Sequence, residues 1–355
     1  MCGIAGYVGK RNLSHEIVME TLAMMKNRGP DHQDYISFED SGNTVYLLHS
    51  RLSIIDLDDR SNQPFTVGNS SLIFNGEIYN YVEIKKEMES TGERFGTTSD
   101  TEILLHNYLR KGTTCVNDFE GMWAFAIYDR NTHHLFLSRD RFAEKPLYYL
   151  VNPDGFYFGS EIKFIQSLLG KKLEVNKAHL MRYLINGYKS LYKTEETYFN
   201  EIRELKYSSN LILQPDFSLK TWKYWTPSYN PDEKMSMEQS IEGCRHYLIE
   251  SMRLRMRSDV PLAFCLSGGV DSASLASIAA KTFNYDVSAF SIIDSDERYN
   301  ESENILATIG DLGCRHTLVH LSPEKMLGRL KNLIAYHDAP VATITYFVHS
   351  ILSEN

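Results

Sequence analysis

Residues 1–10, MCGIAGYVGK, combine a cysteine at position 2 with an apolar run from Gly3 to Gly9 that favours β structure. Such a run predicts a buried strand that begins immediately after the cysteine. A lone cysteine beside a strand is usually a small buried hydrophobe. Removal of Met1 would instead give Cys2 a free α-amine, and an amine of pKa about 7.7–8.0 can take the proton of the adjacent thiol. The stretch therefore leaves two interpretations of Cys2, a packing residue and an N-terminal nucleophile.

The composition is that of a globular protein large enough for two domains. The chain has 355 residues, of which 43% are hydrophobic and 23% charged, and its formal net charge is −9. This acidic balance argues against general nucleic-acid binding. Five widely spaced cysteines without a CxxC pair exclude a disulfide framework and a tetrathiolate zinc site. Because no signal-like or membrane-spanning stretch is present, we predict a cytoplasmic protein with no membrane span and no nucleic-acid partner.

Two different patterns divide the chain. Up to about residue 160, short apolar runs separated by turn residues alternate with a few helical segments, which predicts a strand-rich α+β layered sandwich. Beyond a polar, proline-containing stretch, helices alternate with short apolar strands, which predicts a parallel, doubly wound α/β sheet. We therefore predict a first domain over 1–210, a linker over 211–236 and a second domain over 237–355.

The turn CLSGGVDSAS, residues 265–274, follows the first strand of this second domain and leads into a helix. Ser267, Gly268 and Gly269 leave backbone amides unobstructed, and the helix that begins near Asp271 directs its positive end at the same point. These features predict a phosphate-binding turn, although the lysine of a Walker A loop is missing. The alternative is a plain tight connection, with Asp271 favoured by the helix dipole.

The chain carries nine motifs in order: MCGIAGYVG, NRGPD, RLSIIDL, FNGEIYNY, SDTE, GMWAFAIYD, RDRFAEKPLYY, SEIK and LSGGVDS. This ordered set resembles the family of glutamine-hydrolysing asparagine synthetases, in which a class II glutamine amidotransferase domain is joined to a PP-loop ATP pyrophosphatase domain. The resemblance covers essentially the whole chain. It implies an N-terminal-nucleophile hydrolase sandwich of αββα layers followed by an α/β doubly wound PP-loop domain, and it favours the nucleophile interpretation of Cys2.

The resemblance implies roles for residues of the first domain. Cys2 would attack the side-chain amide of glutamine, form a thioester and release ammonia, while the Asn75 side chain and the Gly76 backbone N–H form the oxyanion hole. Arg51 would bind the substrate α-carboxylate, and Asp100 its α-ammonium. The full implied set for glutamine is Arg51, Leu52, Ile54, Asn75, Gly76, Glu77 and Asp100, with Cys2, Asn75 and Gly76 as the catalytic residues.

Ordinary structural roles compete with three of these assignments. Arg51 could be a solvated cation at the end of a strand. Asp100 stands where a first helical turn is predicted, and a carboxylate is favourable there without any ligand. The dipeptide Asn75-Gly76 is also the favoured sequence of a type I′ hairpin turn.

For the second domain, the resemblance implies that MgATP adenylates a carboxylate, usually that of aspartate, and that ammonia then attacks the acyl-adenylate. The implied ATP-binding residues are Leu266, Ser267, Gly268, Gly269, Asp271, Ser272 and Ile292, and Asp271 is also the candidate Mg²⁺ ligand. The implied cofactors are ATP and Mg²⁺, the implied small-molecule partners are glutamine, ATP and aspartate, and a homodimer is left open.

The chain stops at FVHSILSEN, before a strand and an acidic loop that the family carries. We therefore expect a fragment or a naturally shortened protein, with a complete glutaminase half and an impaired synthetase half. The leading function is synthesis of asparagine from glutamine, ATP and aspartate. One alternative is amidation of another carboxylate, such as a sugar acid of a surface polysaccharide. The other is a glutaminase-only or regulatory homologue.

Overall fold

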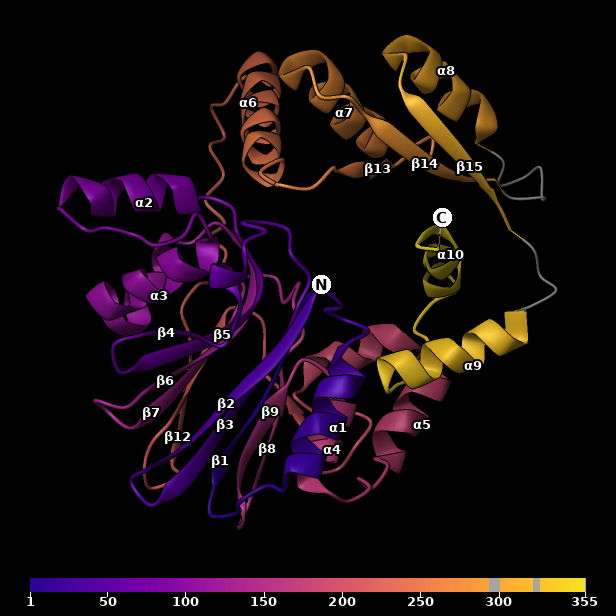
Figure 1. The fold of residues 1–355 in the computed structure, drawn as a ribbon. Helices are drawn as coiled ribbons and strands as arrows, with labels where there is room; N and C mark the ends of the chain where they lie inside the picture. Colours follow the sequence, from indigo (N-terminus) through magenta and orange to yellow (C-terminus); the bar gives the residue numbers. More distant parts are fainter. Residues whose placement is uncertain (294–300, 322–325, 355) are drawn as a thin grey trace. The chain divides into compact units, whose positions relative to one another are not determined.

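The computed structural model describes residues 1–293, 301–321 and 326–354 and divides into two compact units, Met1–Tyr229 and Asn230–Asn355 (Figure 1). Among the helices of the described residues, none is long and apolar enough to cross a membrane.

Two six-stranded antiparallel sheets form the first unit. The first sheet has the order β10 (Arg203–Glu204), β8 (Tyr148–Asn152), β9 (Gly155–Gly159), β1 (Gly3–Gly9), β3 (Asn43–Arg51) and β2 (His32–Asp40). The second sheet has the order β12 (Leu219–Lys223), β11 (Ser209–Leu213), β7 (His134–Arg139), β6 (Gly121–Asp129), β5 (Ser70–Ile78) and β4 (Phe65–Val67). The predicted strand directly after Cys2 is confirmed as β1.

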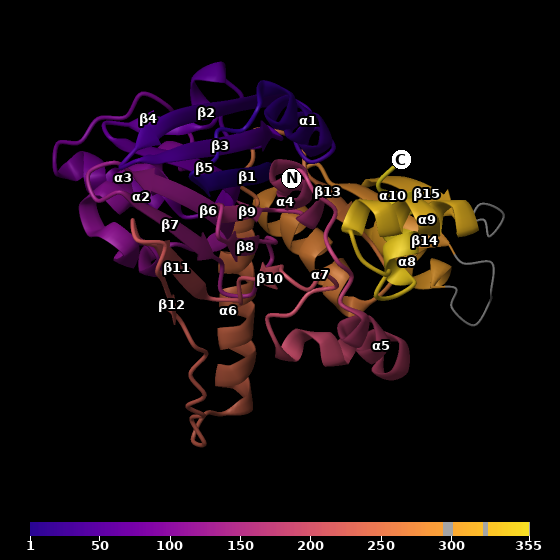
Figure 2. The ribbon, with the colours of Figure 1, turned by 90° about the horizontal axis from the view of Figure 1, so that it is seen from below.

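Helices cover the outer faces of both sheets. The helices α1 (His15–Met25) and α4 (Ile162–Leu169) pack on the first sheet, and α2 (Tyr81–Ser90) and α3 (Asp100–Lys111) pack on the second. Figures 1 and 2 show the two helical layers on opposite sides of the sheets. The remaining helical segments of the unit are η1 (Asp59–Ser61), η2 (Gly112–Asp118), α5 (Lys177–Asn186) and η3 (Tyr188–Lys193). This order of layers confirms the predicted αββα sandwich.

The sandwich holds three apolar layers because both faces of each sheet are covered. Residues such as Ile73 and Leu137 fill the space between the sheets. Leu22 and Phe164 lie between the first sheet and its helices, while Leu104 lies between the second sheet and its helices. This explains why the central strands read as continuous apolar runs rather than alternating ones.

The residues 211–236, for which we predict a linker, begin inside the sandwich. Leu211, Ile212 and Leu213 belong to β11, and β12 pairs with that strand, so the second sheet extends to Lys223. The hairpin is held in place because β11 also pairs with β7.

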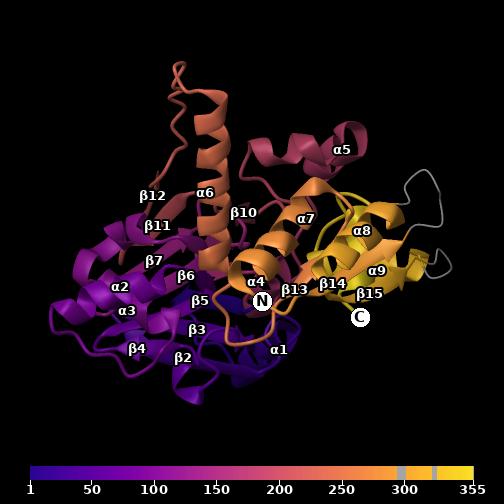
Figure 3. The same ribbon diagram turned by 90° about the horizontal axis from the view of Figure 1, so that it is seen from above.

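The second unit contains the predicted parallel sheet, in the order β13 (Ala263–Cys265), β14 (Ser288–Ile293), β15 (Arg315–His320). The crossovers are α7 (Val270–Ser277) with the following η4 (Ile278–Thr282), and α8 (Ser302–Leu312); the unit also contains α6 (Met237–Arg255), α9 (Met326–His337) and α10 (Thr345–Leu352). Figures 1 and 3 show α7 and α8 over one face of this sheet, and Figure 1 shows α10 on the other.

Candidate active site

A narrow pocket in the sandwich gathers the residues predicted to bind glutamine. Its lining consists of Cys2, Arg51, Leu52, Ile54, Ile55, Gln63, Phe74, Gly76, Glu77, Ser99, Asp100 and Thr101. Every predicted glutaminase residue is in this set except Asn75, which lies in β5 between Phe74 and Gly76. Segments far apart in the chain meet here because β1 pairs with β3 and both pack face to face with β5.

The thiol of Cys2 is held against the backbone of Leu52. Its Sγ accepts the Leu52 N–H at 3.4 Å and lies 3.6 Å from the Leu52 carbonyl oxygen, to which the thiol can donate. Arg28 fixes the same residue through a 2.8 Å hydrogen bond from Nε to the Cys2 carbonyl. Burial raises the pKa of the Cys2 thiol, and nearby Glu77 raises it further. A thiol kept protonated in this way needs a base beside it before it can act as a nucleophile.

Asn75 and Gly76 lie inside β5, opposite Ala124 and Trp123 of β6. The hairpin-turn interpretation of this dipeptide is therefore wrong. The Asn75 side chain is completely buried, and neither its Oδ1 nor its Nδ2 has a hydrogen-bond partner among the described residues. Buried amides are nearly always satisfied, and Asn75 stands next to the pocket residue Gly76, so this exception marks a position where a ligand atom could bind. A Cβ at Gly76 would come within 2.1 Å of the Met122 carbonyl oxygen, which explains the glycine.

Two carboxyl groups share the pocket. Asp100 is the first residue of α3, as predicted, and its Oδ2 accepts the Ile78 N–H at 2.9 Å. Burial raises the pKa of Asp100 to about 6, although hydrogen bonds such as that from Ile78 oppose the change. Burial, followed by the neighbouring Asp100, raises the pKa of Glu77 well above its usual value. A cation bound between them would favour the ionised form of both groups, which suits an ammonium ligand.

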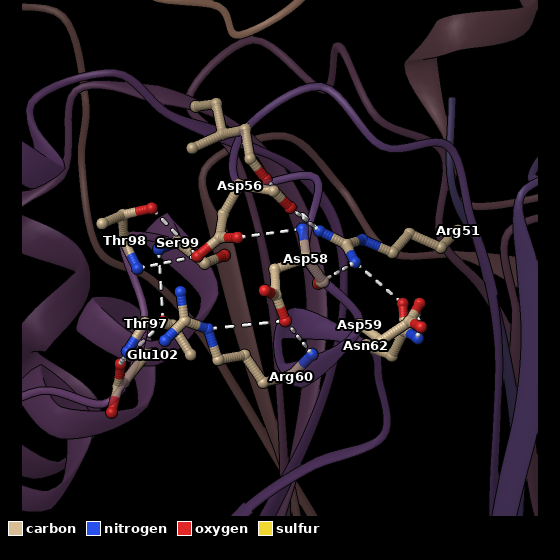
Figure 4. Close-up of polar contacts among 11 residues, drawn as sticks. Arg51, Asp56, Asp58, Asp59, Arg60, Asn62, Thr97, Thr98, Ser99 and Glu102 are labelled. Carbon is tan, nitrogen blue, oxygen red and sulfur yellow. Dashed lines mark hydrogen bonds and ion pairs between the residues drawn. The ribbon is translucent and has the colours of Figure 1, made fainter.

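Arg51 is buried at the end of β3, so its interpretation as a solvated cation is wrong. Its terminal nitrogens donate to the carbonyl oxygens of Ile55, Asp56 and Asp58 and to the side-chain oxygen of Asn62 (Figure 4). The guanidinium therefore organises the loop after β3. A substrate carboxylate would have to replace part of this set before the fork could bind it from both terminal nitrogens.

Asp56 ties this loop to the segment before α3. Its Oδ2 accepts the Thr98 N–H at 2.7 Å, and its Oδ1 accepts the Asp58 N–H at 3.1 Å (Figure 4). Burial alone would raise the pKa of Asp56, but these hydrogen bonds outweigh it and lower that pKa. The loop that carries the Arg51 contacts and the turn that presents Asp100 thus form one connected wall of the pocket.

Sequence reasoning missed several polar residues in and around the pocket, among them Gln63 and Lys145. Gln63 lines the pocket and lacks a motif that would have distinguished it. Lys145 is buried, and its Nζ lies 3.2 Å from the Met1 sulfur. Burial lowers the pKa of Lys145, and Glu77 opposes that change. Lys145 belongs to the motif RDRFAEKPLYY, so the signal was present in the sequence without an assigned role.

In the second unit, the predicted phosphate-binding turn joins β13 to α7. Leu266 is buried and donates its N–H to the Phe290 carbonyl oxygen on β14 at 2.8 Å. The hydroxyl of Ser272 lies 3.2 Å from both the N–H and the hydroxyl of Ser267. Gly268 has a φ of +79°, a conformation that favours glycine. Of the predicted set, Ile292 lies on the neighbouring strand β14, while Asp271 is in the first turn of α7.

The described residues contain no group of three or more His, Cys, Asp or Glu side chains that could bind a metal ion. Within the part of the chain that the structure describes, Asp271 is thus not part of a cage of protein ligands. This fits only a cation that is mostly coordinated by phosphate oxygens and water, as Mg²⁺ commonly is.

Comparison with known proteins agrees with both units. Residues 1–225 match the glutamine amidotransferase domain, and residues 243–354 match asparagine synthase. Asparagine synthetase [glutamine-hydrolyzing] 1 of Bacillus subtilis is 31% identical over 349 residues, which cover 96% of this chain and 54% of that protein. Asparagine synthetase [glutamine-hydrolyzing] 3 of the same organism is 32% identical over 294 residues, covering 80% of this chain and 46% of that protein. Amidase chyE of Penicillium rubens is 28% identical over 388 residues, covering 100% and 56%.

The sandwich fold and the order of the two matches define the class of protein as one that joins a glutamine amidotransferase domain to an asparagine synthase domain. The chain belongs to the glutamine amidotransferase domain family and continues into an asparagine synthase domain. It spans about half the length of the curated relatives that it matches.

Proposed function

We propose that this chain hydrolyses glutamine to glutamate and ammonia at Cys2, as the glutaminase half of an asparagine synthetase. The observation that carries the proposal is a pocket lined by both Cys2 and Gly76, next to Asn75 in β5, whose side-chain amide is buried without a partner in the described residues. A strand that leaves both polar atoms of a side chain unsatisfied loses stability. A ligand that these atoms bind would account for that cost.

The reaction begins once Met1 has been removed and Cys2 carries the α-amine. The amine takes the thiol proton, and the sulfur attacks the side-chain carbonyl carbon of glutamine. Ammonia leaves with the proton, and a thioester to Cys2 remains. Water then adds to the thioester carbon, the carbon–sulfur bond breaks, and glutamate is released with the thiol restored.

The oxyanion of each tetrahedral intermediate would accept hydrogen bonds from the Asn75 Nδ2 and from the Gly76 N–H. Donors held rigidly in a buried site stabilise such a charge more than water does, because no reorganisation is needed during the reaction. The position of both residues within one strand supplies this rigidity.

The two ends of the substrate amino acid would be bound on opposite sides of the pocket. Asp100 and Glu77 would hold the α-ammonium, because a cation relieves the repulsion between two buried carboxylates. Arg51 would hold the α-carboxylate by exchanging some of its contacts with the loop 55–62.

For the second unit we propose ATP binding at the turn 266–272, just before α7. The N–H groups of Ser267 and Gly269 donate to the hydroxyls of Ser272 and Ser267, and phosphate oxygens would replace these acceptors. When ATP is bound there, it activates a carboxylate by adenylation with release of pyrophosphate. Asp271 would contribute one ligand to Mg²⁺. We propose aspartate as the acceptor, and cytoplasm as the location.

The test is to incubate the purified chain with glutamine, MgATP and aspartate, and to quantify glutamate, AMP and asparagine together by mass spectrometry. Production of glutamate that Cys2→Ala abolishes supports the glutaminase. Asparagine and AMP rising in step with glutamate would support the complete synthetase. No glutamate from a folded chain with Met1 removed would refute the proposal.

A different acceptor carboxylate is the second candidate function, because one of the similar proteins is named an amidase rather than an asparagine synthetase. In that case glutamate and AMP would form with another carboxylate, and aspartate would not stimulate AMP formation. The same assay with a panel of amino-acid and sugar carboxylates separates the two.

A further inference from the structure

The strand β5 has an open edge where it passes the candidate site. β4 pairs with β5 only from Ser70 to Leu72, whereas β6 pairs with the other edge of β5 as far as Ile78. Alternate residues of an antiparallel strand direct their N–H and C=O groups to the same edge. The N–H and C=O groups of Phe74, Gly76 and Ile78 therefore point to the edge of β5 on which β4 lies. Within the described part of the chain, β4 ends before it reaches these three residues.

Side chains take the place of the missing strand. The Oε1 of Gln63 accepts the Phe74 N–H at 2.6 Å, and the Nε2 of His49 lies 3.0 Å from the Phe74 carbonyl oxygen. Since a carbonyl oxygen can only accept, the His49 nitrogen is the donor. Four residues further on, Asp100 accepts the Ile78 N–H at 2.9 Å. The Gly76 N–H lies between these two attachments.

Both side chains that hold Phe74 are themselves fixed. His49 is completely buried in β3, and burial lowers its pKa to about 3, so the ring is neutral. Gln63 is also buried, and its Nε2 donates to the Thr101 hydroxyl at 3.3 Å. Gln63 thus connects the open edge of β5 to the turn of α3 that presents Asp100.

We propose that Gln63 and His49 are positioning residues for glutamine hydrolysis. By holding the Phe74 backbone from its N–H and from its C=O, they fix the peptide that leads into Asn75, and with it the directions of the Asn75 side chain and the Gly76 N–H. This inference rests on the proposed glutaminase. Neither residue belongs to the predicted site, and both would act by fixing the orientation of the two oxyanion donors.

The contacts predict a specific kinetic effect. When one attachment of Phe74 is lost, Arg51 keeps its contacts with the loop 55–62 and Asp100 keeps its hydrogen bond with Ile78, whereas the oxyanion donors can move. Because a misplacement of about 1 Å in a catalytic group can cost about 100-fold in rate, we expect kcat to fall roughly 10- to 100-fold while KM changes less than about 3-fold.

The experiment compares Gln63→Met and His49→Phe, which remove the acceptor and the donor, with His49→Gln, which restores an N–H donor. The control is Tyr128→Phe, which removes a different, partly buried hydrogen bond between the sheets, from the Tyr128 hydroxyl to Asp40 at 2.9 Å. For each variant we would measure kcat and KM for glutamine, the affinity for the γ-aldehyde analogue of glutamine, and the rate of Cys2 alkylation by iodoacetamide.

The aldehyde and the iodoacetamide separate positioning from general damage. The thiol adds to the aldehyde carbon and creates an oxyanion, whereas alkylation forms a carbon–sulfur bond as iodide leaves and creates none. We expect kcat and aldehyde affinity to fall together in Gln63→Met and His49→Phe. His49→Gln should recover at least part of both, and Tyr128→Phe should resemble the wild type. Alkylation should stay within about 2-fold throughout, because it needs no oxyanion hole.

The possible failures are distinguishable. A wild-type chain that forms no glutamate would overturn the proposed function and this inference with it. An active wild type whose Gln63→Met and His49→Phe variants keep their kcat would overturn the inference alone. A parallel loss of alkylation, aldehyde affinity and thermal stability would assign these residues a purely structural role. Should Gln63→Met fail to fold, Gln63→Glu can replace it, because glutamate keeps an acceptor oxygen. The comparison of His49→Phe with His49→Gln then tests the inference.

Discussion

The carboxylate of Asp100, at the start of α3, accepts the backbone N–H of Ile78, at the end of β5, at 2.9 Å. This contact joins a helix N-terminus to the strand that contains Asn75 and Gly76. It also places a buried carboxyl next to Glu77, so that the strand which would stabilise an oxyanion is flanked by the groups that would bind an ammonium.

Asn75→Ala should abolish most of the glutaminase activity without unfolding the protein. Loss of one oxyanion donor lowers kcat by about 10²–10³. Because the Asn75 amide has no partner in the described residues, its removal breaks no hydrogen bond, and we expect the free energy of unfolding to change by less than about 1 kcal/mol. Steady-state kinetics and urea titration measure the two quantities.

Asn210→Ala is the matched control for that variant. Asn210 lies in β11 of the same sheet, and both polar atoms of its side chain are likewise buried without a partner in the part of the chain described. Its replacement should leave kcat unchanged. Equal losses of kcat in the two variants would show that Asn75→Ala lowers kcat by disturbing the fold and not by removing an oxyanion donor.

Asp100→Asn should stabilise the protein at pH 7 and weaken glutamine binding. The pKa of Asp100 is about 6 in the folded state against an ordinary value of 3.8, so the folded state binds its proton more tightly. The stabilisation this provides is complete below about pH 3.8 and is lost as the pH rises through about 6. The neutral amide avoids that loss, and we expect about 1–3 kcal/mol more stability at pH 7.

Chemical denaturation of wild type and Asp100→Asn between pH 4 and pH 8 measures this effect. The stability difference should grow with pH and level off above the pKa of Asp100. In the same variant KM for glutamine should rise at least about 10-fold, since a buried charge partner of the ammonium is lost. A difference in stability that is independent of pH would refute the raised pKa.

Arg51→Lys should destabilise the protein as well as weaken glutamine binding. The ammonium of lysine cannot reproduce the fork that donates to the carbonyl oxygens of Ile55, Asp56 and Asp58 and to Asn62. At least one buried carbonyl would lose its partner, at a cost of about 1–3 kcal/mol.

Arg60→Lys serves as the control in the same loop, because Arg60 is exposed and pairs with Asp58 at 3.5 Å. Its replacement should change the free energy of unfolding by less than about 1 kcal/mol. Thermal melts of both variants measure the contrast. Equal melting temperatures for Arg51→Lys and Arg60→Lys would contradict the structural role assigned to Arg51.

His49 should make the protein sensitive to mild acid. Its pKa falls from 6.5 to about 3 on folding, so only the unfolded chain takes up this proton between those values. The associated stability is complete above about pH 6.5 and declines as the pH falls toward 3. From pH 7 to pH 5 we expect a loss of about 2 kcal/mol from this group.

Urea titrations of wild type and His49→Gln at pH 7 and pH 5 isolate this contribution, because all other groups titrate in both proteins. Replacement of the exposed His15 by Gln is the control and should not alter the acid sensitivity. An undiminished loss of stability in His49→Gln would indicate that other groups cause it.

Removal of Met1 should be required for glutaminase activity. A chain with an N-terminal extension that a protease can cut immediately before Cys2 should be inactive before cleavage and active afterwards, because only cleavage frees the α-amine. Intact-mass measurement confirms each state. An active, uncleaved chain would mean that another group accepts the thiol proton, and buried Lys145, whose Nζ lies 3.2 Å from the Met1 sulfur, is the first alternative to test.

Local sequence determined the elements that carry the site. The apolar run after Cys2 became β1, Arg51 ends a strand, and Asp100 begins a helix, each as the residue pattern indicates. Such features depend on neighbours a few residues away, namely on hydrophobic alternation and on helix-capping side chains. The alternation of strands and helices after residue 236 likewise predicted the parallel sheet.

Only the tertiary structure decided what these residues face. The dipeptide Asn75-Gly76 has the sequence of a turn, but its pairing with β6 extends the strand through it. Arg51 is buried because the loop after it folds back over its guanidinium. Gln63 and His49 bind β5 because β4 ends early and leaves backbone groups without a strand partner. The pairing of distant strands sets where an edge opens, so the pattern around any one of these residues could not reveal it.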